Sequence, residues 1–333
     1  MVEPKSGGAL LMRPIAIFSY NRPQYLKRVL ESLAPQIKDG TKVFLYQDGP
    51  NSALTRQCIS LFNEYFPKDK TVDEWIDHKG NLETRQNIVY DSWWEGTNNL
   101  GIAFNHKRAR DRILETHDSA IFIEEDAVLN NYYIQMLNTA MDLVDGYKVG
   151  MVSCFGEHQF YKGIFNELQY LQKHSDSYTQ QEINQSSFIP MRHMFAYGMF
   201  RESWHSIKDI MDGYYKLLPR DGFRRGAYKK RPHGKILDYM ASHGIKRNAI
   251  VSSQDSCIFS SLTLKGYVNI STFTKNMVNI GELGEHYRPH IHRRHFSGQA
   301  LYDKPVYNFN WDQDIRSSIA NMLNKIYLTK DNH

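Results

Sequence analysis

Three consecutive acidic residues are the part of the sequence best suited to chemistry. Glu124, Glu125 and Asp126 directly follow the apolar run Ile-Phe-Ile at 121–123. Adjacent carboxylates repel one another where water is scarce, and such groups often share a cation. Oxygen ligands at a strand end suit Mg²⁺ or Mn²⁺, which bind one or two carboxylates together with a diphosphate. A solvated acidic turn is the alternative interpretation, and three acids alone do not exclude it.

Two earlier segments also pass from apolar residues into polar ones. The run at 15–18 leads into Ser19–Arg22, and the run at 43–46 leads into Gln47 and Asp48. Short continuous apolar runs are typical of strands covered on both faces. In parallel sheets, ligands bind beyond the carboxyl ends of the strands. The three strand ends together would offer a hydrogen-bond acceptor, an arginine and a metal site, as a nucleoside diphosphate requires.

The spacing of apolar residues predicts the elements that position these groups. Helices are expected from Pro23, at 52–66 and at 103–116, and a strand at 119–123 precedes the acidic residues. Strands that alternate with helices predict an α/β fold with a mostly parallel central sheet flanked by helices. The second half is less regular, with expected strands at 149–155 and 195–200 and expected helices at 201–218, at 257–264 and around 315–326.

Composition restricts the class of protein. The 333 residues are 41% hydrophobic and 13% aromatic, which indicates a folded globular chain. The net charge of +5 is too small to indicate nucleic-acid binding, although it allows an anionic ligand or peripheral contact with a membrane. No apolar run approaches the roughly 18 residues of a membrane span. The three cysteines form no CxxC pair and are expected to be reduced thiols in a cytoplasmic protein.

Short motifs in a fixed order resemble a known enzyme family. FSYNRPQYLKRVLESL, LYQDGP, NNLGIAFNHKRA and IFIEEDAVLNNYYIQML look like the nucleotide-binding half of a GT-A glycosyltransferase. HMFAYGMFRESW and SSQDSCIFSSLTLKGYVNISTFTKNMVNIGELGEH resemble its smaller acceptor-side subdomain. The nearest resemblance is to the family of the Golgi N-acetylglucosaminyltransferase I and its bacterial relatives. It covers residues 13–290.

The resemblance implies four parts of the chain. Residues 1–12 would be a flexible leader, 13–150 the nucleotide-sugar-binding half, 151–300 the acceptor-binding and catalytic half, and 301–333 a C-terminal extension with an amphipathic helix. The extension would cap the core, form a dimer or lead into a further domain. These three alternatives stay open.

The resemblance also implies roles for individual residues. Asn21 and Arg22 would belong to the donor nucleotide site, with Arg22 on the diphosphate, and Asp48 would accept from the uracil N–H. Glu125 would bond the ribose or the donor sugar, Asp126 would be the direct metal ligand, and Glu124 would shape the strand end. The candidate set is completed by Asp255 as the catalytic base, by Asn105 at the position of a family histidine near the nucleotide, and by His286 near the donor phosphates.

Three positions depart from the family pattern. Glu125 stands where the family has an aspartate, Gln254 replaces the tryptophan that commonly precedes the catalytic aspartate, and Asn105, with His106 beside it, stands where the family has a histidine. Independently of the resemblance, Ser253–Asp255 also has the composition of a helix N-cap, which is the alternative role of Asp255.

The function implied is a metal-dependent transferase that moves a hexosyl or N-acetylhexosaminyl group from a UDP-sugar to a glycan hydroxyl. A cation, Mn²⁺ or Mg²⁺, would stabilise the leaving diphosphate, and a carboxylate would take the acceptor proton. A base on the face opposite the diphosphate implies inversion at the sugar carbon. The alternatives are a retaining transferase and a catalytically silent glycan-binding module on the same fold. A sugar nucleotidyltransferase is disfavoured because SYNRPQY contains no Gly-rich phosphate loop.

The acceptor is expected to be a polysaccharide intermediate of a bacterial surface, such as a lipopolysaccharide or capsule precursor. The segment at 220–235, with seven Lys or Arg residues, is either solvated surface or a loop that grips such an anionic acceptor. The protein is expected to be cytoplasmic. Peripheral association with the inner face of the membrane and a homodimer stay open. The dense histidines at 286–295 have no Cys or carboxylate at a zinc-site spacing, which disfavours structural zinc.

Overall fold

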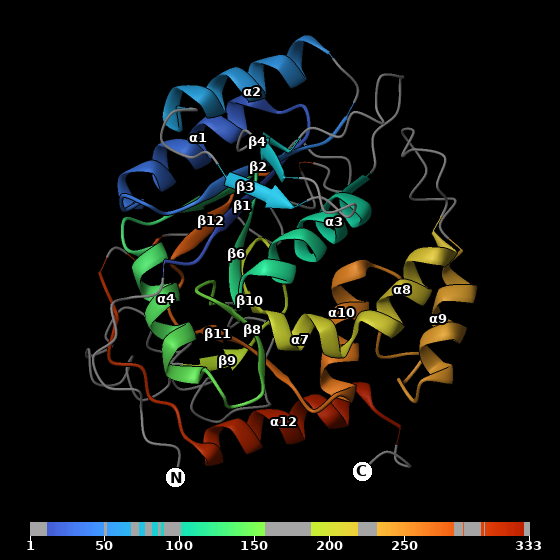
Figure 1. The fold of residues 1–333 in the computed structure, drawn as a ribbon. Helices are drawn as coiled ribbons and strands as arrows, with labels where there is room; N and C mark the ends of the chain where they lie inside the picture. Colours follow the sequence, from blue (N-terminus) through green and yellow to red (C-terminus); the bar gives the residue numbers. More distant parts are fainter. Residues whose placement is uncertain are drawn as a thin grey trace.

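An eight-stranded sheet runs through the middle of the molecule in the computed structural model (Figure 1). The structure describes residues 12–49, 52–67, 73–76, 82–85, 88–89, 101–156, 188–218, 232–282, 289, 301–302 and 304–329. The order of the strands is β5-β2-β1-β6-β10-β8-β11-β9. Strand β10 is antiparallel to both of its neighbours and β9 is antiparallel to β11, while the other adjacent pairs are parallel.

The strands of this sheet are β1 (Ile15–Ser19), β2 (Val43–Gln47), β5 (Ile88–Val89), β6 (Ser119–Glu124), β8 (Val149–Ser153), β9 (Phe188–Pro190), β10 (Ala196–Phe200) and β11 (Val268–Thr272). Two antiparallel pairs lie outside it: β7 (Ala127–Leu129) with β12 (Met277–Asn279), and β3 (Asp73–Ile76) with β4 (Leu82–Arg85).

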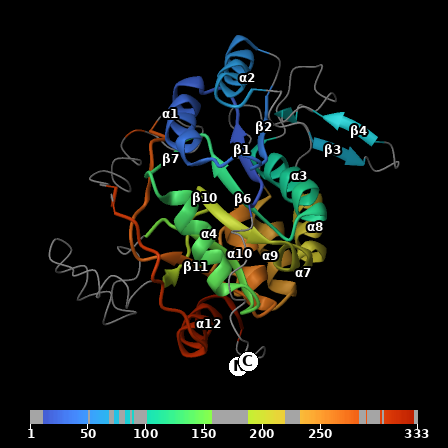
Figure 2. The ribbon, with the colours of Figure 1, turned by 60° about the vertical axis from the view of Figure 1, so that its left-hand side comes forward.

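Helices cover both faces of the sheet (Figures 1 and 2). One face packs against α1 (Pro23–Leu33), α2 (Ala53–Tyr65), α4 (Tyr133–Val144) and α12 (Gln313–Tyr327). The other packs against α3 (Gly101–Thr116), α7 (Arg201–Ser206), α8 (Lys208–Leu217), α9 (His233–Ser242) and α10 (Gln254–Leu264). A short 3₁₀ turn, η1 (Ala34–Gln36), follows α1.

The two-sided cover explains why the strands are apolar throughout. Ile15 and Ile17 of β1 point into one hydrophobic cluster, and Ala16 and Phe18 point into the other. Side chains alternate between the faces of a strand, so a strand buried on both faces must be apolar at every position. The α/β fold with a mostly parallel central sheet, expected from the sequence, is confirmed.

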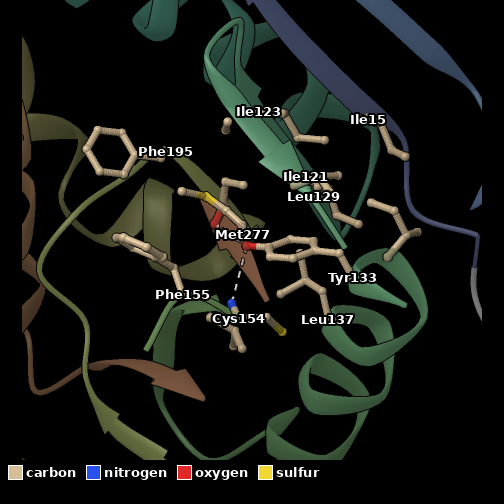
Figure 3. Close-up of a cluster of buried hydrophobic side chains, with 14 of the residues drawn as sticks. Ile15, Ile121, Ile123, Leu129, Tyr133, Leu137, Cys154, Phe155, Phe195 and Met277 are labelled. Carbon is tan, nitrogen blue, oxygen red and sulfur yellow. Dashed lines mark hydrogen bonds between the residues drawn. The ribbon is translucent and has the colours of Figure 1, made fainter. Parts of the chain in front are cut away.

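The hydroxyl of Tyr133 makes hydrogen bonds inside the core on the α4 face (Figure 3). The hydroxyl of Tyr133 lies among buried apolar side chains and donates to the carbonyl oxygen of Ala196 at 2.7 Å. It also accepts from the backbone N–H of Cys154 at 3.3 Å, shown as a dashed line. Burial raises the pKa of the Tyr133 hydroxyl, so this group remains protonated and links α4 to β8 and β10 as a neutral hydrogen-bonding partner.

Most expected elements agree with the structure within one or two residues. Pro23 occupies the first position of α1, as predicted, because the missing N–H of proline is not needed there. The C-terminal helix buries Ile319 and Leu323 against the core, while a dimer contact and a further domain stay open. The three cysteines are free and buried. Among the described residues, no helix is long and apolar enough to cross a membrane.

Two expectations about the second half were wrong in detail. The helix predicted at 201–218 is two helices, α7 and α8, which are separated at Ile207. The basic segment predicted at 220–235 ends earlier, because His233 begins helix α9. Its part at 220–231 lies outside the described residues. The division at residue 150 stays a prediction, and strands from both sides of it share the central sheet.

The tight packing of β10 against α4 gives a test of the fold. A Cβ added at Gly198 would collide with the side chain of the buried Met141. We expect Gly198→Ala to lower the free energy of unfolding by about 1–3 kcal/mol, because overpacking shifts buried side chains. The measurement is urea unfolding. Gly234→Ala in α9, where a Cβ meets nothing within 4 Å, is the control, and equal stabilities of the two variants would contradict the packing.

Candidate active site

The predicted polar strand ends meet at one edge of the sheet. Ser19, the last residue of β1, is level with Gln47 at the end of β2, and Phe18 is level with Glu124 at the end of β6. Because these three strands are parallel and adjacent, the polar residues that follow them gather at their shared carboxyl edge. The structure therefore brings together the segments at 19–22, 47–48 and 124–126.

Arg22 is the centre of the polar contacts at this edge. Its Nε lies 2.7 Å from Oε1 of Glu125, and its Nη1 lies 3.1 Å from Oδ2 of Asp126. The second oxygen of Glu125 accepts from the Ser19 hydroxyl at 3.0 Å and from the Tyr20 backbone N–H at 2.8 Å. Both carboxylates are buried. One guanidinium thus bridges two adjacent buried acids, and the carboxylates raise the pKa of Arg22 against the opposing effect of burial.

Asp126 is held from a second direction by the turn after β12. Its Oδ1 accepts from Asn279 Nδ2 at 3.2 Å, and its carbonyl accepts from the Ile280 N–H at 2.9 Å. Asn279 in turn accepts from the Gly281 N–H at 2.9 Å. A Cβ at Gly281 would collide with the Asp126 carboxylate. The Asn-Ile-Gly turn therefore has to contain glycine for the chain to approach Asp126 this closely.

Asp48 is fixed by backbone N–H groups. Its Oδ1 accepts from the N–H of Gly49 at 2.8 Å, and its Oδ2 accepts from the N–H of Gly101 at 2.9 Å. Gly101 is the first residue of α3, where the helix dipole favours a negative charge. Each carboxylate oxygen has a further lone pair, so a buried Asp48 held in this way can still accept a hydrogen bond from a ligand.

Asn105 uses its side chain within the protein. Its Nδ2 donates to the carbonyl of Tyr46 at 2.9 Å, and its Oδ1 accepts from Arg108 Nε at 2.9 Å. Arg108 Nη2 then donates to the carbonyl of Gln47 at 2.8 Å. These bonds tie α3 to the end of β2, so in this structure the Asn105 amide orients the strand end that carries Asp48.

Glu124 and Asp255 add further negative charge. Burial raises the pKa of Glu124 well above its usual range, and the charges of Asp126 and Asp255 raise it further. This interaction between Glu124 and Asp255 means that the start of α10 lies near the end of β6. Two acids that are far apart in the sequence are thereby brought into one electrostatic cluster with Asp126.

The cap of α10 bears on the two roles considered for Asp255. Ser253 is the N-cap residue, and its hydroxyl accepts from the Ser256 N–H at 3.3 Å. Asp255 is the second residue of the helix. The stretch 253–255 therefore starts the helix, as the alternative interpretation held, although the capping side chain is that of Ser253. Asp255 lies in the first turn, where the helix dipole favours a negative charge, and its role as a base stays a prediction.

Two candidate residues, Asn21 and His286, remain to be placed. Asn21 is partly exposed at the same edge, beside Arg22. His286 and the other histidines at 290–295 lie outside the described residues. Sequence reasoning missed Ser19 and Asn279 as partners of the acids, although the Asn-Ile-Gly turn that carries Asn279 had been noticed. It gave no role to Arg110 or His106, which are buried beneath the acidic strand end.

A divalent cation fits this donor set only in part. No three side chains of His, Cys, Asp or Glu within the described ranges are grouped so that they could hold a metal ion by themselves. Carboxylates are nevertheless the oxygen ligands that Mg²⁺ and Mn²⁺ prefer, and such ions commonly take one or two of them together with phosphate oxygens and water. The donor set of the strand end suits a cation shared with a phosphate ligand.

No family model matches the chain, and no curated protein matches it. Among solved structures, the chain is similar to the mannosyltransferase PcManGT from Pyrobaculum calidifontis, solved with GDP-Man and Mn²⁺. The identity is 15%, the match covers 80% of this chain and 56% of that one, and the TM-score is 0.43. The chain thus spans little more than half the length of that mannosyltransferase.

Two further solved structures are similar to the chain. Glucosyl-3-phosphoglycerate synthase from Mycobacterium tuberculosis, in complex with phosphoglyceric acid, has 12% identity over 61% of this chain and 64% of that one, with a TM-score of 0.32. The galactosyltransferase LgtC, in complex with donor and acceptor sugar analogs, has 12% identity over 94% of each chain, with a TM-score of 0.34.

The assignment of the α10 cap can be tested by stability. We expect Ser253→Ala to lower the free energy of unfolding by about 1 kcal/mol, because the first turn loses its side-chain acceptor. Asp255→Asn should cost less, since it removes no cap and relieves repulsion with Glu124. Chemical denaturation measures both. A larger loss for the Asp255 variant would contradict the cap assignment.

Proposed function

We propose that the protein is a metal-dependent glycosyltransferase of GT-A type that moves a sugar from a UDP-sugar to a hydroxyl of a glycan or glycoconjugate, with inversion. The observation that carries the proposal is the arginine at the end of β1 that bridges two buried carboxylates at the end of β6. A third carboxylate, Asp48, follows the adjacent strand β2. These charged groups lie at the carboxyl edge of parallel strands, which is where ligands bind in open α/β sheets.

The balance of charge supports a cation. Glu124, Glu125, Asp126 and Asp255 form one electrostatic cluster, and Arg22 is its nearest cation. Carboxylates that outnumber their cations in a buried site favour binding of a positive ion. Asp126 would be the direct ligand of Mn²⁺ or Mg²⁺. The cation would neutralise the charge that develops on the leaving diphosphate.

Arg22 would have two positions in the working enzyme. Without ligands its guanidinium neutralises Asp126 and Glu125. When a cation occupies Asp126, Arg22 becomes available for the diphosphate, to which a planar guanidinium can donate two hydrogen bonds. Glu125 keeps its bonds from Ser19 and Tyr20 in either state, which suits a group that bonds the ribose or the donor sugar.

The fixed geometry of Asp48 supports recognition of the base. Its backbone partners hold the carboxylate in place, so that it would accept from the uracil N–H. Asn105 keeps the strand end in place behind it, and Asn21 would contribute at the rim. His286 would lie near the donor phosphates. Because the Asp48 carboxylate only accepts hydrogen bonds, it would favour UDP over nucleotides whose base has no N–H donor at that position.

Asp255 would act as the general base. It comes from the second half of the chain, and it lies close enough to Glu124 to affect the pKa of that carboxyl. A base at the start of α10 would remove the proton from the acceptor hydroxyl, which then attacks the sugar carbon opposite the diphosphate. The transferred group would be a hexosyl or N-acetylhexosaminyl group, as in the N-acetylglucosaminyltransferase I family.

The acceptor would be a lipopolysaccharide or capsule-type intermediate, made at the inner face of the membrane. The experiment that tests the proposal is a screen of UDP-sugars for Mn²⁺-dependent hydrolysis, with water in place of the unknown acceptor. Hydrolysis of at least one donor supports the proposal. A silent binding module would bind UDP and hydrolyse none.

The metal role of Asp126 predicts the behaviour of one variant. Asp126→Ala should abolish Mn²⁺-dependent UDP binding and leave the fold intact, because the site has few protein ligands to lose. Calorimetry with and without Mn²⁺ measures this. Asp142→Ala, which removes a carboxylate paired with Arg13 at the start of β1, is the control. Unchanged UDP affinity in the Asp126 variant would refute the metal assignment.

The base-recognition role of Asp48 predicts a smaller effect. Asp48→Ala should weaken UDP binding by about 0.5–1.5 kcal/mol, the worth of one hydrogen bond, and by more if the uracil N–H is left buried without a partner. Titration calorimetry compares it with Asp238→Ala, which removes a surface partner of Arg247. Equal affinities of the two variants would exclude Asp48 from the uracil site.

The catalytic role of Asp255 predicts a kinetic effect. Asp255→Asn keeps the shape of the side chain but cannot take a proton, so turnover should fall about 10²–10⁴-fold while donor affinity barely changes. Single-turnover kinetics measure the rate, and NMR of the product gives the configuration of the anomeric carbon. A near-normal rate, or an α-linked product from an α-linked donor, would contradict an inverting base.

A further inference from the structure

A buried arginine without a carboxylate partner lies beneath the acidic strand end. Arg110 of α3 is fully buried. Its Nε and Nη2 both donate to the hydroxyl of Tyr197, at 3.1 and 2.7 Å, and its Nη1 has no hydrogen-bond partner within the described part of the chain. None of the carboxylates described lies within ion-pair distance of it. A buried charge without a carboxylate partner is costly. The rings of Tyr197 and Trp204 face the guanidinium, with centroids 5.8 and 5.4 Å from Cζ, and offset part of that cost.

Arg110 determines which nitrogen of His106 can carry a proton. Its Nη2 lies 3.4 Å from Nδ1 of His106, one helical turn earlier on α3. A guanidinium only donates, so Nδ1 has to be the accepting nitrogen and the proton of the neutral ring has to be on Nε2. Burial lowers the pKa of His106 well below its usual range, and the charge of Arg110 lowers it further. The ring is therefore neutral at neutral pH.

The protonated nitrogen of His106 faces the acidic strand end. Its Nε2 lies 3.9 Å from Oε1 of Glu124. The ring is stacked on Phe18 of β1, with centroids 3.5 Å apart and an angle of 14° between the planes. Because Phe18 fixes the plane of the ring and Arg110 fixes its tautomer, the direction of the Nε2–H bond is fixed as well.

We propose that Arg110 and His106 are positioning residues for Glu124: Arg110 holds His106 as the neutral Nε2–H tautomer, and that N–H faces the Glu124 carboxyl from 3.9 Å, beyond direct hydrogen-bond distance, and orients it by electrostatic attraction. The positioning role rests on the proposed function, whereas the tautomer does not. A neutral imidazole serves this purpose better than a cation. An imidazolium would pair with Glu124 and remove negative charge that a metal ion and the donor sugar would otherwise meet.

Within the described part of the chain, three side chains are in contact with the ring of His106. On its own helix it meets Arg110, from β1 it meets the uncharged ring of Phe18, and from β6 it meets Glu124. Tyr197 of β10 reaches it only through Arg110. The tautomer therefore depends chiefly on Arg110, and a single substitution should change it.

Ring ¹⁵N NMR tests the tautomer without any substrate. The signals of His106 are those lost in His106→Gln. At pH 7 we expect wild-type His106 to be protonated at Nε2 alone, and Arg110→Met to show a mixture of tautomers and a higher pKa. His117, the residue after α3, gives an internal contrast. Its Nδ1 lies 3.1 Å from the carbonyl oxygen of Ile113 and 2.9 Å from the Thr116 hydroxyl, and because the carbonyl can only accept, Nδ1 should carry the proton in the neutral ring. An Nδ1–H tautomer or an imidazolium at His106 in the wild type would overturn the proposal.

The control for the arginine is Arg13→Met. Arg13 is also buried, but it is bonded to Ser119, Asn138 and Asp142 away from the site. This substitution should lower stability and leave the His106 signals unchanged. If Arg110→Met does not fold, Tyr197→Phe removes the hydroxyl that accepts from Arg110 and should loosen the same tautomer preference. His106 signals identical to the wild type in a folded variant of either kind would overturn the role of Arg110.

Two substitutions of His106 test the positioning of Glu124. Phe keeps the aromatic stack on Phe18 but has no N–H, whereas Gln places an N–H near the position of Nε2. We expect His106→Phe to lower the kcat of UDP-sugar hydrolysis severalfold, by less than the factor of about ten that one full hydrogen bond would give, with KM unchanged, and His106→Gln to restore part of the loss. Equal rates of Phe variant and wild type would overturn the positioning role.

The outcomes separate this inference from the proposed function. A wild-type protein that hydrolyses no UDP-sugar but has the Nε2–H tautomer would refute the proposed function alone. In that case the crystal structure of the Phe variant decides the positioning role. The Glu124 carboxyl should leave its wild-type position when the N–H is absent, and an unmoved carboxyl would overturn the proposal.

Discussion

The ion pairs of Arg22 with Glu125 and Asp126 are the interaction on which the rest of the site depends. Buried carboxylates at a strand end are unfavourable unless a cation or hydrogen-bond donors meet them. The chain supplies both, because Arg22 comes from the end of β1 and the backbone N–H of Tyr20 and the side chain of Asn279 come from either side. Under the proposed function, a metal ion would replace Arg22 at Asp126, so the same carboxylates would serve both stability and binding.

The fold places these groups by means of parallel strands and two long-range contacts. Strands β2, β1 and β6 end at one edge, so residues near positions 20, 48 and 125 meet without any special loop. The turn after β12 and the start of α10 come from more than 120 residues further along the chain. They bring Asn279 to Asp126 and Asp255 near Glu124. Local strand geometry thus brings together the segments after β1, β2 and β6, and tertiary packing adds Asn279 and Asp255 to them.

The strand ends of β1, β2 and β6 could be predicted from the sequence because their signals are local. Continuous apolar runs identified β1, β2 and β6, and Pro23 identified the start of α1. The break at Ile207 could not be predicted, because the apolar spacing continues through it and only tertiary packing reveals the two helices. The same holds for the Arg110–His106 pair. Both residues look like ordinary positions of an amphipathic helix until the fold shows that they are buried.

Occupancy of the acidic strand end is the claim from which the rest follows. The most direct measurement is a crystal structure of the protein with Mn²⁺ and UDP, recorded with the anomalous signal of manganese. The account predicts a manganese peak beside the Asp126 carboxylate, with the Arg22 guanidinium turned from Asp126 to the diphosphate and the uracil N–H on Asp48. UDP bound elsewhere, or Arg22 still paired with Asp126 and no manganese peak beside it, would contradict the account.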